Sequence, residues 1–307
     1  MDFSGCGTAL VTPFRPDGAL DEFALHALVD WQIASGINML LACGSTGEAA
    51  TLTKEEWLKA IRIVAEASGG RVPVWAGCTH NSTREAAARA KDVAKVSGVT
   101  AILTANPYYN KPTQEGQYQH FRAIAEAVKL PVVLYNVPGR TGANLEPATV
   151  LRLAEDVPNI IGIKESSGNL PQITELTCIL PARFRVYAGD DNLALATLAL
   201  GASGLISVAS NVIPSEMAAL VAAALGSEWA HARRLNKRYF QLIQALFWET
   251  NPGPVKAMLA MMGRVTEAYR LPMVPVSATA RRNLEKLAGE MGLLVNAPQE
   301  DGDLRTF

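Results

Sequence analysis

The chain has 307 residues, of which 49% are hydrophobic and 19% charged, and this composition is typical of a folded globular protein and not of a disordered or fibrous one. Its 28 Lys and Arg balance 29 Asp and Glu, and the net charge of -1 disfavours a nucleic-acid groove or a binding surface for anionic membranes. The longest apolar run, residues 217–225, is too short to span a bilayer, and the first residues lack the pattern of a secretory signal, so we expect a cytoplasmic protein.

Short apolar segments in the first two thirds of the chain predict eight β-strands. They cover residues 7–11, 37–42, 72–77, 100–105, 132–136, 160–165, 185–188 and 204–208. Helical patterns lie between most of them. Two of these helices are expected to begin with capping boxes, formed by Thr53 with Glu56 and by Ser82 with Glu85, and two more cover residues 146–155 and 192–200.

Eight strands alternating with helices are typical of a (β/α)8 TIM barrel. A doubly wound open sheet is the alternative, but it usually has a glycine-rich turn after its first strand, where this chain has Thr12-Pro13-Phe14. After the last strand the sequence predicts only helices, over residues 215–225, 227–248, 255–262 and 279–291. We therefore expect an α/β barrel with the active site in residues 1–225 and a helical C-terminal domain in residues 226–307, with a polar, loose tail from Asn296.

The cysteines and histidines do not indicate a metal site. Cys6, Cys43, Cys78 and Cys178 form no C-x-x-C pair, and the four histidines are scattered without a zinc-binding spacing. We expect reduced and mostly buried thiols. A nucleotide-binding glycine loop and a G-x-S-x-G motif are also missing, so the sequence predicts neither a metal nor a cofactor.

Polar residues follow several of the strands, and in a TIM barrel the active site lies at these strand ends. Lys164 ends the apolar stretch of the sixth strand, where burial would favour the neutral, nucleophilic amine that forms Schiff bases with ketones. An ion pair with Glu165 is the structural alternative. Tyr135 ends the neighbouring strand and could exchange protons with that nitrogen.

Other strand ends offer groups that could bind a carboxylate. Ser45 and Thr46 lie in a glycine-flanked turn, and Arg140 could hold a carboxylate through its planar guanidinium. Each also has a purely structural interpretation: the Ser-Thr segment could be an ordinary tight turn, and Arg140 could be a surface arginine in a loop. Tyr108 and Tyr109 could be packing or interface residues, and Asp190 and Asp191 are expected to cap the next helix.

These motifs resemble the dihydrodipicolinate synthase and N-acetylneuraminate lyase superfamily of pyruvate-binding barrels. The resemblance extends from about Gly5 to the C-terminal helices. It is found in the segments 44–48 (GSTGE), 107–112 (PYYNKP), 135–142 (YNVPGRTG), 163–168 (IKESSG), 189–191 (GDD) and 251–256 (NPGPVK). The Gly-Arg-Thr-Gly run at 139–142 favours the synthase branch, which acts in lysine biosynthesis through diaminopimelate. Ser45 stands where synthases usually have threonine, but it keeps the hydroxyl.

The resemblance implies a lyase that condenses pyruvate with aspartate semialdehyde and uses no cofactor, because Lys164 itself forms the Schiff base. Tyr135 would be the general acid and base of a relay with Ser45 and Tyr109, and Tyr109 would reach a neighbouring subunit of a homotetramer. Thr46 would bind the pyruvate carboxylate and Arg140 that of the semialdehyde. Ile206 and Gly189 would line the same pocket.

The resemblance also implies an effector site at the dimer contact, where free lysine inhibits many members of the family. The corresponding residues are Ala50, Lys54, Trp57, Asn81, Glu85 and Tyr108. Glu85 could hold the ammonium of lysine, whereas a cation at Lys54 would repel it. We therefore expect weak or absent inhibition.

Two other functions are compatible with the sequence. A related pyruvate aldolase or dehydratase could act on a sugar acid, although a neutral polyol acceptor would not need Arg140. A non-catalytic keto-acid-binding barrel would bind pyruvate without a covalent bond to Lys164. All three readings imply small-molecule ligands and no nucleic acid or membrane partner.

Overall fold

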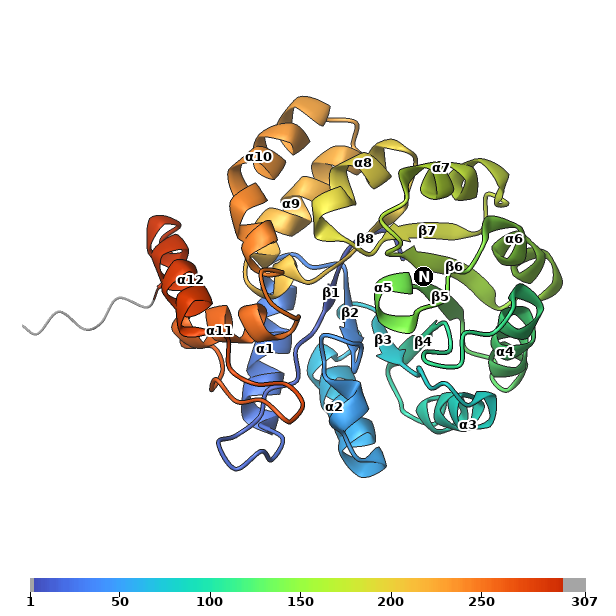
Figure 1. The fold of residues 1–307 in the computed structure, drawn as a ribbon, viewed down its shortest axis with the longest axis horizontal. Helices are drawn as coiled ribbons and strands as arrows, with labels where there is room; N and C mark the ends of the chain where they lie inside the picture. Colours follow the sequence, from blue (N-terminus) through green and yellow to red (C-terminus); the bar gives the residue numbers. More distant parts are fainter. Residues whose placement is uncertain (1–2, 295–307) are drawn as a thin grey trace, which may run out of the picture.

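Eight parallel strands form a closed barrel in chain order, with β8 hydrogen-bonded to β1 (Figure 1). The structure, a computed structural model, describes residues 3–294. The strands are β1 (Gly5–Ala9), β2 (Met39–Ala42), β3 (Val74–Gly77), β4 (Val99–Ala105), β5 (Val132–Asn136), β6 (Ile160–Glu165), β7 (Arg185–Ala188) and β8 (Gly204–Ser207). All eight predicted strands are confirmed within two residues at each end, and the closed barrel excludes the open doubly wound sheet.

Helices surround this barrel (Figure 1). They are α1 (Glu22–Ala34), α2 (Lys54–Ser68), α3 (Thr83–Val93), α4 (Gln114–Glu126), α6 (Pro147–Asp156), α7 (Leu170–Ile179), α8 (Ala194–Ala199) and α9 (Pro214–Leu225). Short helical turns lie at strand ends, namely α5 (Pro138–Thr141), η1 (Ala49–Thr51), η2 (Asp191–Leu193) and η3 (Ala209–Asn211). The single helix predicted for residues 192–200 is therefore two elements, η2 and α8.

The predicted helical extension is confirmed as α10 (Trp229–Ala245), α11 (Gly253–Met261) and α12 (Ala278–Glu290). Helix α10 packs on α9, and α11 contacts both α12 and η3, which follows β8. The extension thus reaches the end of the barrel where the strands finish. The proposed boundary at residues 225 and 226 falls between α9 and α10 and stays a prediction, while the tail from Asn296 lies outside the described residues.

One of the two predicted capping boxes forms. The Thr53 hydroxyl accepts a hydrogen bond from the Glu56 backbone N–H at 3.2 Å, and the Glu56 carboxylate accepts one from the Thr53 N–H at 3.0 Å. The prediction of a capping box at Ser82 was wrong. The Ser82 N–H donates to Nδ1 of His80 at 3.0 Å, and the Glu85 carboxylate pairs with Arg84 at 3.2 Å, so neither side of this box is made.

The interior of the barrel is filled and does not form a channel. Inward-facing side chains from the strands pack into one cluster, in which the rings of Trp75 and Tyr187 meet edge to face at 5.3 Å. Large side chains in this position are usual for a TIM barrel and leave its C-terminal mouth as the place for a site.

The thiols agree with the prediction. Cys6, Cys43 and Cys78 are buried, Cys178 is exposed, and all four are free. Burial raises the pKa of the Cys43 thiol to about 12, so this group, although it lines the cavity described below, is held in its neutral form. Within residues 3–294, no helix combines the length and apolar character needed to cross a membrane.

Candidate active site

A cavity of about 650 Å³ lies at the C-terminal mouth of the barrel. Residues at the strand ends line it, and the extension contributes Phe247, Asn251, Pro252, Pro272 and Met273. The structure brings six residues of the predicted catalytic and substrate-binding set together here. They are Ser45, Thr46, Tyr135, Arg140, Lys164 and Gly189.

Lys164 is the penultimate residue of β6 and only 5% exposed. Its Nζ lies 4.4 Å from the centre of the Tyr135 ring, because Lys164 and Tyr135 are paired in the register of β5 and β6. The ion pair with Glu165 does not form, since successive residues of a strand face opposite sides. Among residues 3–294 no carboxylate lies within ion-pair distance of the Lys164 amine, and nothing acidic there competes with a substrate for it.

The Glu165 side chain instead stabilises the end of β6 on the face opposite Lys164. Its buried carboxylate accepts hydrogen bonds from Asn136 Nδ2 at 3.0 Å, from the Ser167 N–H at 2.6 Å and from Gln172 Nε2 at 3.2 Å. Burial raises the pKa of Glu165, and these donors oppose that shift. The contacts join the ends of β5 and β6 to α7, which fixes the backbone that carries Tyr135 and Lys164.

Gly189 leaves room for the lysine. A Cβ at this position would lie 2.9 Å from Cε of Lys164 and 2.0 Å from Oγ of Ser166. A side chain at position 189 would therefore displace the amine, which explains a glycine at the end of β7 without any direct role in binding.

Side chains of the helical extension form hydrogen bonds with the Gly44–Glu48 turn. Thr46 is 3% exposed, and its Oγ1 accepts a hydrogen bond from Asn251 Nδ2 at 2.9 Å. Glu48 has a left-handed backbone with φ of 51°, and its carboxylate accepts a hydrogen bond from Lys256 Nζ at 2.6 Å. Ser45, by contrast, is exposed at the surface of the turn.

Arg140 comes from α5, the short turn after β5, and its Nη2 donates to the backbone carbonyl of Asn251 at 3.1 Å. Asn251 and Lys256 had no assigned role in the sequence. Both residues belong to the Asn-Pro-Gly-Pro-Val-Lys run at 251–256, which the sequence singled out as a motif. The sequence alone does not show that this segment lies against the turn at residues 44–48.

The pair formed by Lys256 and Glu48 supports a stability prediction. Both side chains are buried, at 0% and 2% exposure, and burial lowers the pKa of Lys256 while Glu48 opposes that shift. Lys256→Met would leave a buried, unpaired carboxylate and should lower the free energy of unfolding by about 3–5 kcal/mol. Urea unfolding measures this. The double variant with Glu48→Gln is the control, and it should recover part of the loss if the unpaired charge is the cause.

Two predicted residues lie outside the lining of the cavity. Tyr109 has a left-handed backbone with φ of 72°, and its side chain is 90% exposed and does not line the cavity of its own barrel. Ile206 is buried in the barrel interior below the cavity, where its Cδ1 occupies the space beside Gly7, and Val208 lines the cavity instead.

The paired aspartates at the end of β7 have different partners. Asp190 caps η2 as expected, by accepting a hydrogen bond from the Asn192 N–H at 3.0 Å. The expectation that Asp191 does the same was wrong. Its buried carboxylate accepts hydrogen bonds from the N–H groups of Val208 and Ala209, at 2.8 and 3.2 Å, and so fixes the turn after β8.

The residues of the expected effector site divide into two groups. Ala50 and Tyr108 line the cavity. The side chains of the other four contact residues that are not in the set. Lys54 forms an ion pair with Asp92 at 2.6 Å, and Glu85 forms one with Arg84. Trp57 donates a hydrogen bond to the Gly77 carbonyl at 3.0 Å, and Asn81 donates one to Asn110 at 3.2 Å. Lys54 is thus not a free cation, whereas Arg89 lines the cavity without a carboxylate at ion-pair distance in the described part of the chain.

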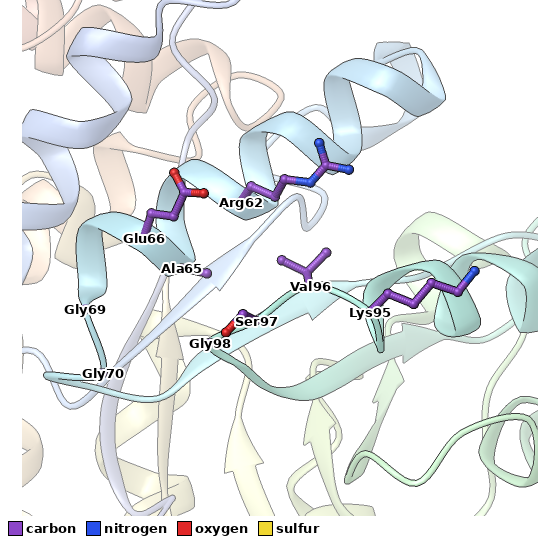
Figure 2. A pocket seen from close by; sticks show the side chains of 9 residues that line it. All are labelled: Arg62, Ala65, Glu66, Gly69, Gly70, Lys95, Val96, Ser97 and Gly98. Carbon is purple, nitrogen blue, oxygen red and sulfur yellow. The ribbon is translucent and has the colours of Figure 1, made fainter.

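A second cavity, of about 550 Å³, lies between the end of α2 and the loop that leads into β4 (Figure 2). Its charged side chains, Arg62, Glu66 and Lys95, are all exposed, and glycines make up much of the remaining wall. It faces the N-terminal ends of the strands, where TIM-barrel enzymes do not place their chemistry. The cavity around Lys164 is therefore the candidate active site.

Known proteins that are similar to this chain identify its family. The profile of the dihydrodipicolinate synthetase family matches residues 2–291. The chain belongs to this family. It is 66% identical to the 4-hydroxy-tetrahydrodipicolinate synthase of Acidobacterium capsulatum over 298 residues, which cover 97% of this chain and 99% of the relative.

Solved structures agree with the family assignment. Dihydrodipicolinate synthase from Aquifex aeolicus superposes with a TM-score of 0.94 at 39% identity, over 96% of this chain and all of that one. The chloride-inhibited enzyme from Acinetobacter baumannii, solved with pyruvate, gives 0.93 at 43% identity, over 95% of this chain and all of that one. The family member described here is thus an enzyme, a lyase built on a TIM barrel.

Proposed function

We propose that this chain condenses pyruvate with L-aspartate 4-semialdehyde to 4-hydroxy-tetrahydrodipicolinate, in the lysine and diaminopimelate pathway of the cytoplasm. The observation that carries the proposal is the buried Lys164 amine, which faces the cavity beside Tyr135 without a carboxylate partner among the described residues. The relatives in the family carry this enzyme name, and one was solved with pyruvate.

The proposed reaction begins when the Lys164 amine attacks the ketone carbon of pyruvate. Loss of one water gives an iminium ion, in which the positive nitrogen makes the methyl protons acidic. Removal of one proton gives an enamine, whose carbon attacks the aldehyde carbon of the semialdehyde. The alkoxide formed takes up a proton, and the amino group of the same substrate then displaces Lys164 from the imine carbon and closes the ring.

The residues of the cavity suit these steps. Tyr135 lies beside the amine and would carry protons to and from it. Ser45 would be a further member of the relay, together with a Tyr109 supplied by a neighbouring subunit. Thr46 would bind the pyruvate carboxylate, and Arg140 would bind the semialdehyde carboxylate in a charge-assisted contact. The bond to Lys164 supplies the electron sink, so the proposal requires no cofactor.

An assay of acceptor preference tests this function against the sugar-acid alternative. Purified enzyme is given pyruvate with aspartate semialdehyde, and separately N-acetylneuraminate or keto-sugar acids are offered for cleavage. We expect turnover only with the semialdehyde, because Arg140 provides a cation that a neutral polyol does not need. Preferred cleavage of a sugar acid would contradict the proposed acceptor.

The proposed assembly is a homotetramer in which Tyr109 enters a neighbouring active site. Tyr109→Phe should slow turnover and leave Schiff-base formation intact, because the hydroxyl only transfers protons. Steady-state kinetics and borohydride trapping measure the two effects, with Tyr108→Phe as the matched control. A monomer in sedimentation that stays active at high dilution would rule out this role.

Feedback inhibition by lysine should be weak or absent. Glu85, the group expected to hold the ligand's ammonium, pairs with Arg84, and Arg89 presents a cation to the cavity. Two like charges 4 Å apart repel by ~1 kcal/mol in water and by more when shielded from it. Activity titrated with L-lysine at saturating pyruvate measures this, and half-inhibition below the millimolar range would show that the site is functional.

A further inference from the structure

Asn251 lies where the helical extension meets the mouth of the barrel, directly before α11. It is 6% exposed and lines the cavity. Its neighbours in the chain hold it in place. The Gly253 carbonyl accepts a hydrogen bond from the Tyr269 hydroxyl at 3.0 Å, and Lys256 is paired with Glu48. The segment is thus fixed at several points and can act as a rigid support for the site.

The side chain of Asn251 determines which way the Thr46 hydroxyl points. Nδ2 of an amide can only donate, so Thr46 Oγ1 is the acceptor in their 2.9 Å hydrogen bond. The hydroxyl proton of Thr46 is therefore free to donate to another group. A hydroxyl oriented in this way is a donor for a carboxylate bound in the cavity.

The backbone of the same residue holds Arg140. The Asn251 carbonyl accepts a hydrogen bond from one terminal nitrogen of the guanidinium at 3.1 Å, which leaves the other N–H groups available for a carboxylate. One residue thus contacts both groups that would bind substrate carboxylates, and it carries no charge of its own.

We infer that Asn251 is a positioning residue: its side-chain amide orients the Thr46 hydroxyl toward the pyruvate carboxylate, and its carbonyl holds Arg140 toward that of the second substrate. This inference rests on the proposed function. It requires a neutral donor at position 251. An aspartate has the same shape, but it would accept a hydrogen bond from Thr46, reverse the direction of the hydroxyl and add a negative charge beside two carboxylate sites.

The test compares Asn251→Asp with Asn251→Ala. Pyruvate binding to each variant and to the wild type is measured by isothermal titration calorimetry, which needs no second substrate. Asn251→Ala should raise the pyruvate Kd, because the hydroxyl is no longer oriented, and should leave the KM for the semialdehyde nearly unchanged, because the backbone carbonyl remains. Asn251→Asp should raise the pyruvate Kd further, by roughly tenfold or more, the effect of losing a hydrogen bond to a charged group.

A purely structural role predicts the opposite order, because aspartate fills the same space as asparagine and alanine leaves a gap. An Asp variant that binds pyruvate as well as the Ala variant, or better, would therefore overturn the inference. If the Ala variant does not fold, the isosteric Asp variant decides alone, and a pyruvate Kd equal to that of the wild type overturns the inference.

A double-mutant cycle adds a second readout. In a Thr46→Val background the Asn251→Ala change should no longer affect the pyruvate Kd, since no hydroxyl remains to be oriented. An equal effect in both backgrounds would overturn the inference. A wild type that binds pyruvate but makes no product with the semialdehyde would refute the proposed function and the part of the inference that concerns Arg140. The pyruvate Kd of the variants would still decide the part that concerns Thr46.

Discussion

Lys164→Ala should have no measurable turnover while the fold is retained. The covalent step needs a nucleophilic amine, and in the described part of the chain no other lysine lines the cavity. The other buried lysine, Lys256, has 0% exposure and donates to Glu48 at 2.6 Å, so its amine cannot replace the lost one. Steady-state kinetics measure the loss, and circular dichroism shows whether the fold remains.

Lys164→Arg is the matched control for charge. It keeps a cation at the end of β6, but a guanidinium is not a nucleophile toward ketones, so this variant should be as inactive as Lys164→Ala. If charge alone were needed, Lys164→Arg would retain most of the activity, and the role assigned to the amine would have to be abandoned.

Arg140→Ala should raise the KM for aspartate semialdehyde and leave that for pyruvate nearly unchanged. A lost charge-assisted contact is worth roughly 1.5–3 kcal/mol, or about 10- to 150-fold. Arg140→Lys should recover only part of the loss, since an ammonium lacks the planar arrangement of donors. Equal changes in both KM values would instead mean that Arg140 only shapes the loop after β5, through its contact with Asn251.

The barrel could be predicted from the sequence because each strand is a short apolar run and polar residues follow it. The same pattern placed Lys164 and Tyr135 side by side, since the ends of parallel strands meet at one edge. Helices α1, α4 and α7 were only implied by the alternation. The box at Ser82 failed because the ring of His80 accepts the hydrogen bond from the Ser82 backbone N–H that the motif assigns to the carboxylate of Glu85.

The support of the site from the extension could not be predicted in this way. Asn251 contacts Thr46 across 205 positions of the chain, and Lys256 contacts Glu48 across 208. A local sequence pattern cannot predict contacts between residues that are so far apart in the chain. Asp191 shows the same limit, because its carboxylate caps the turn after β8 and not the helix that follows it in sequence.

The most direct test of the account is to trap the covalent intermediate. Enzyme incubated with pyruvate is reduced with borohydride, digested and analysed by peptide mass spectrometry. The account predicts one reduced pyruvyl group, carried by the peptide that contains Lys164 and missing from Lys164→Ala. A pyruvyl group on another lysine, or turnover of both substrates without any trapped adduct, would contradict it.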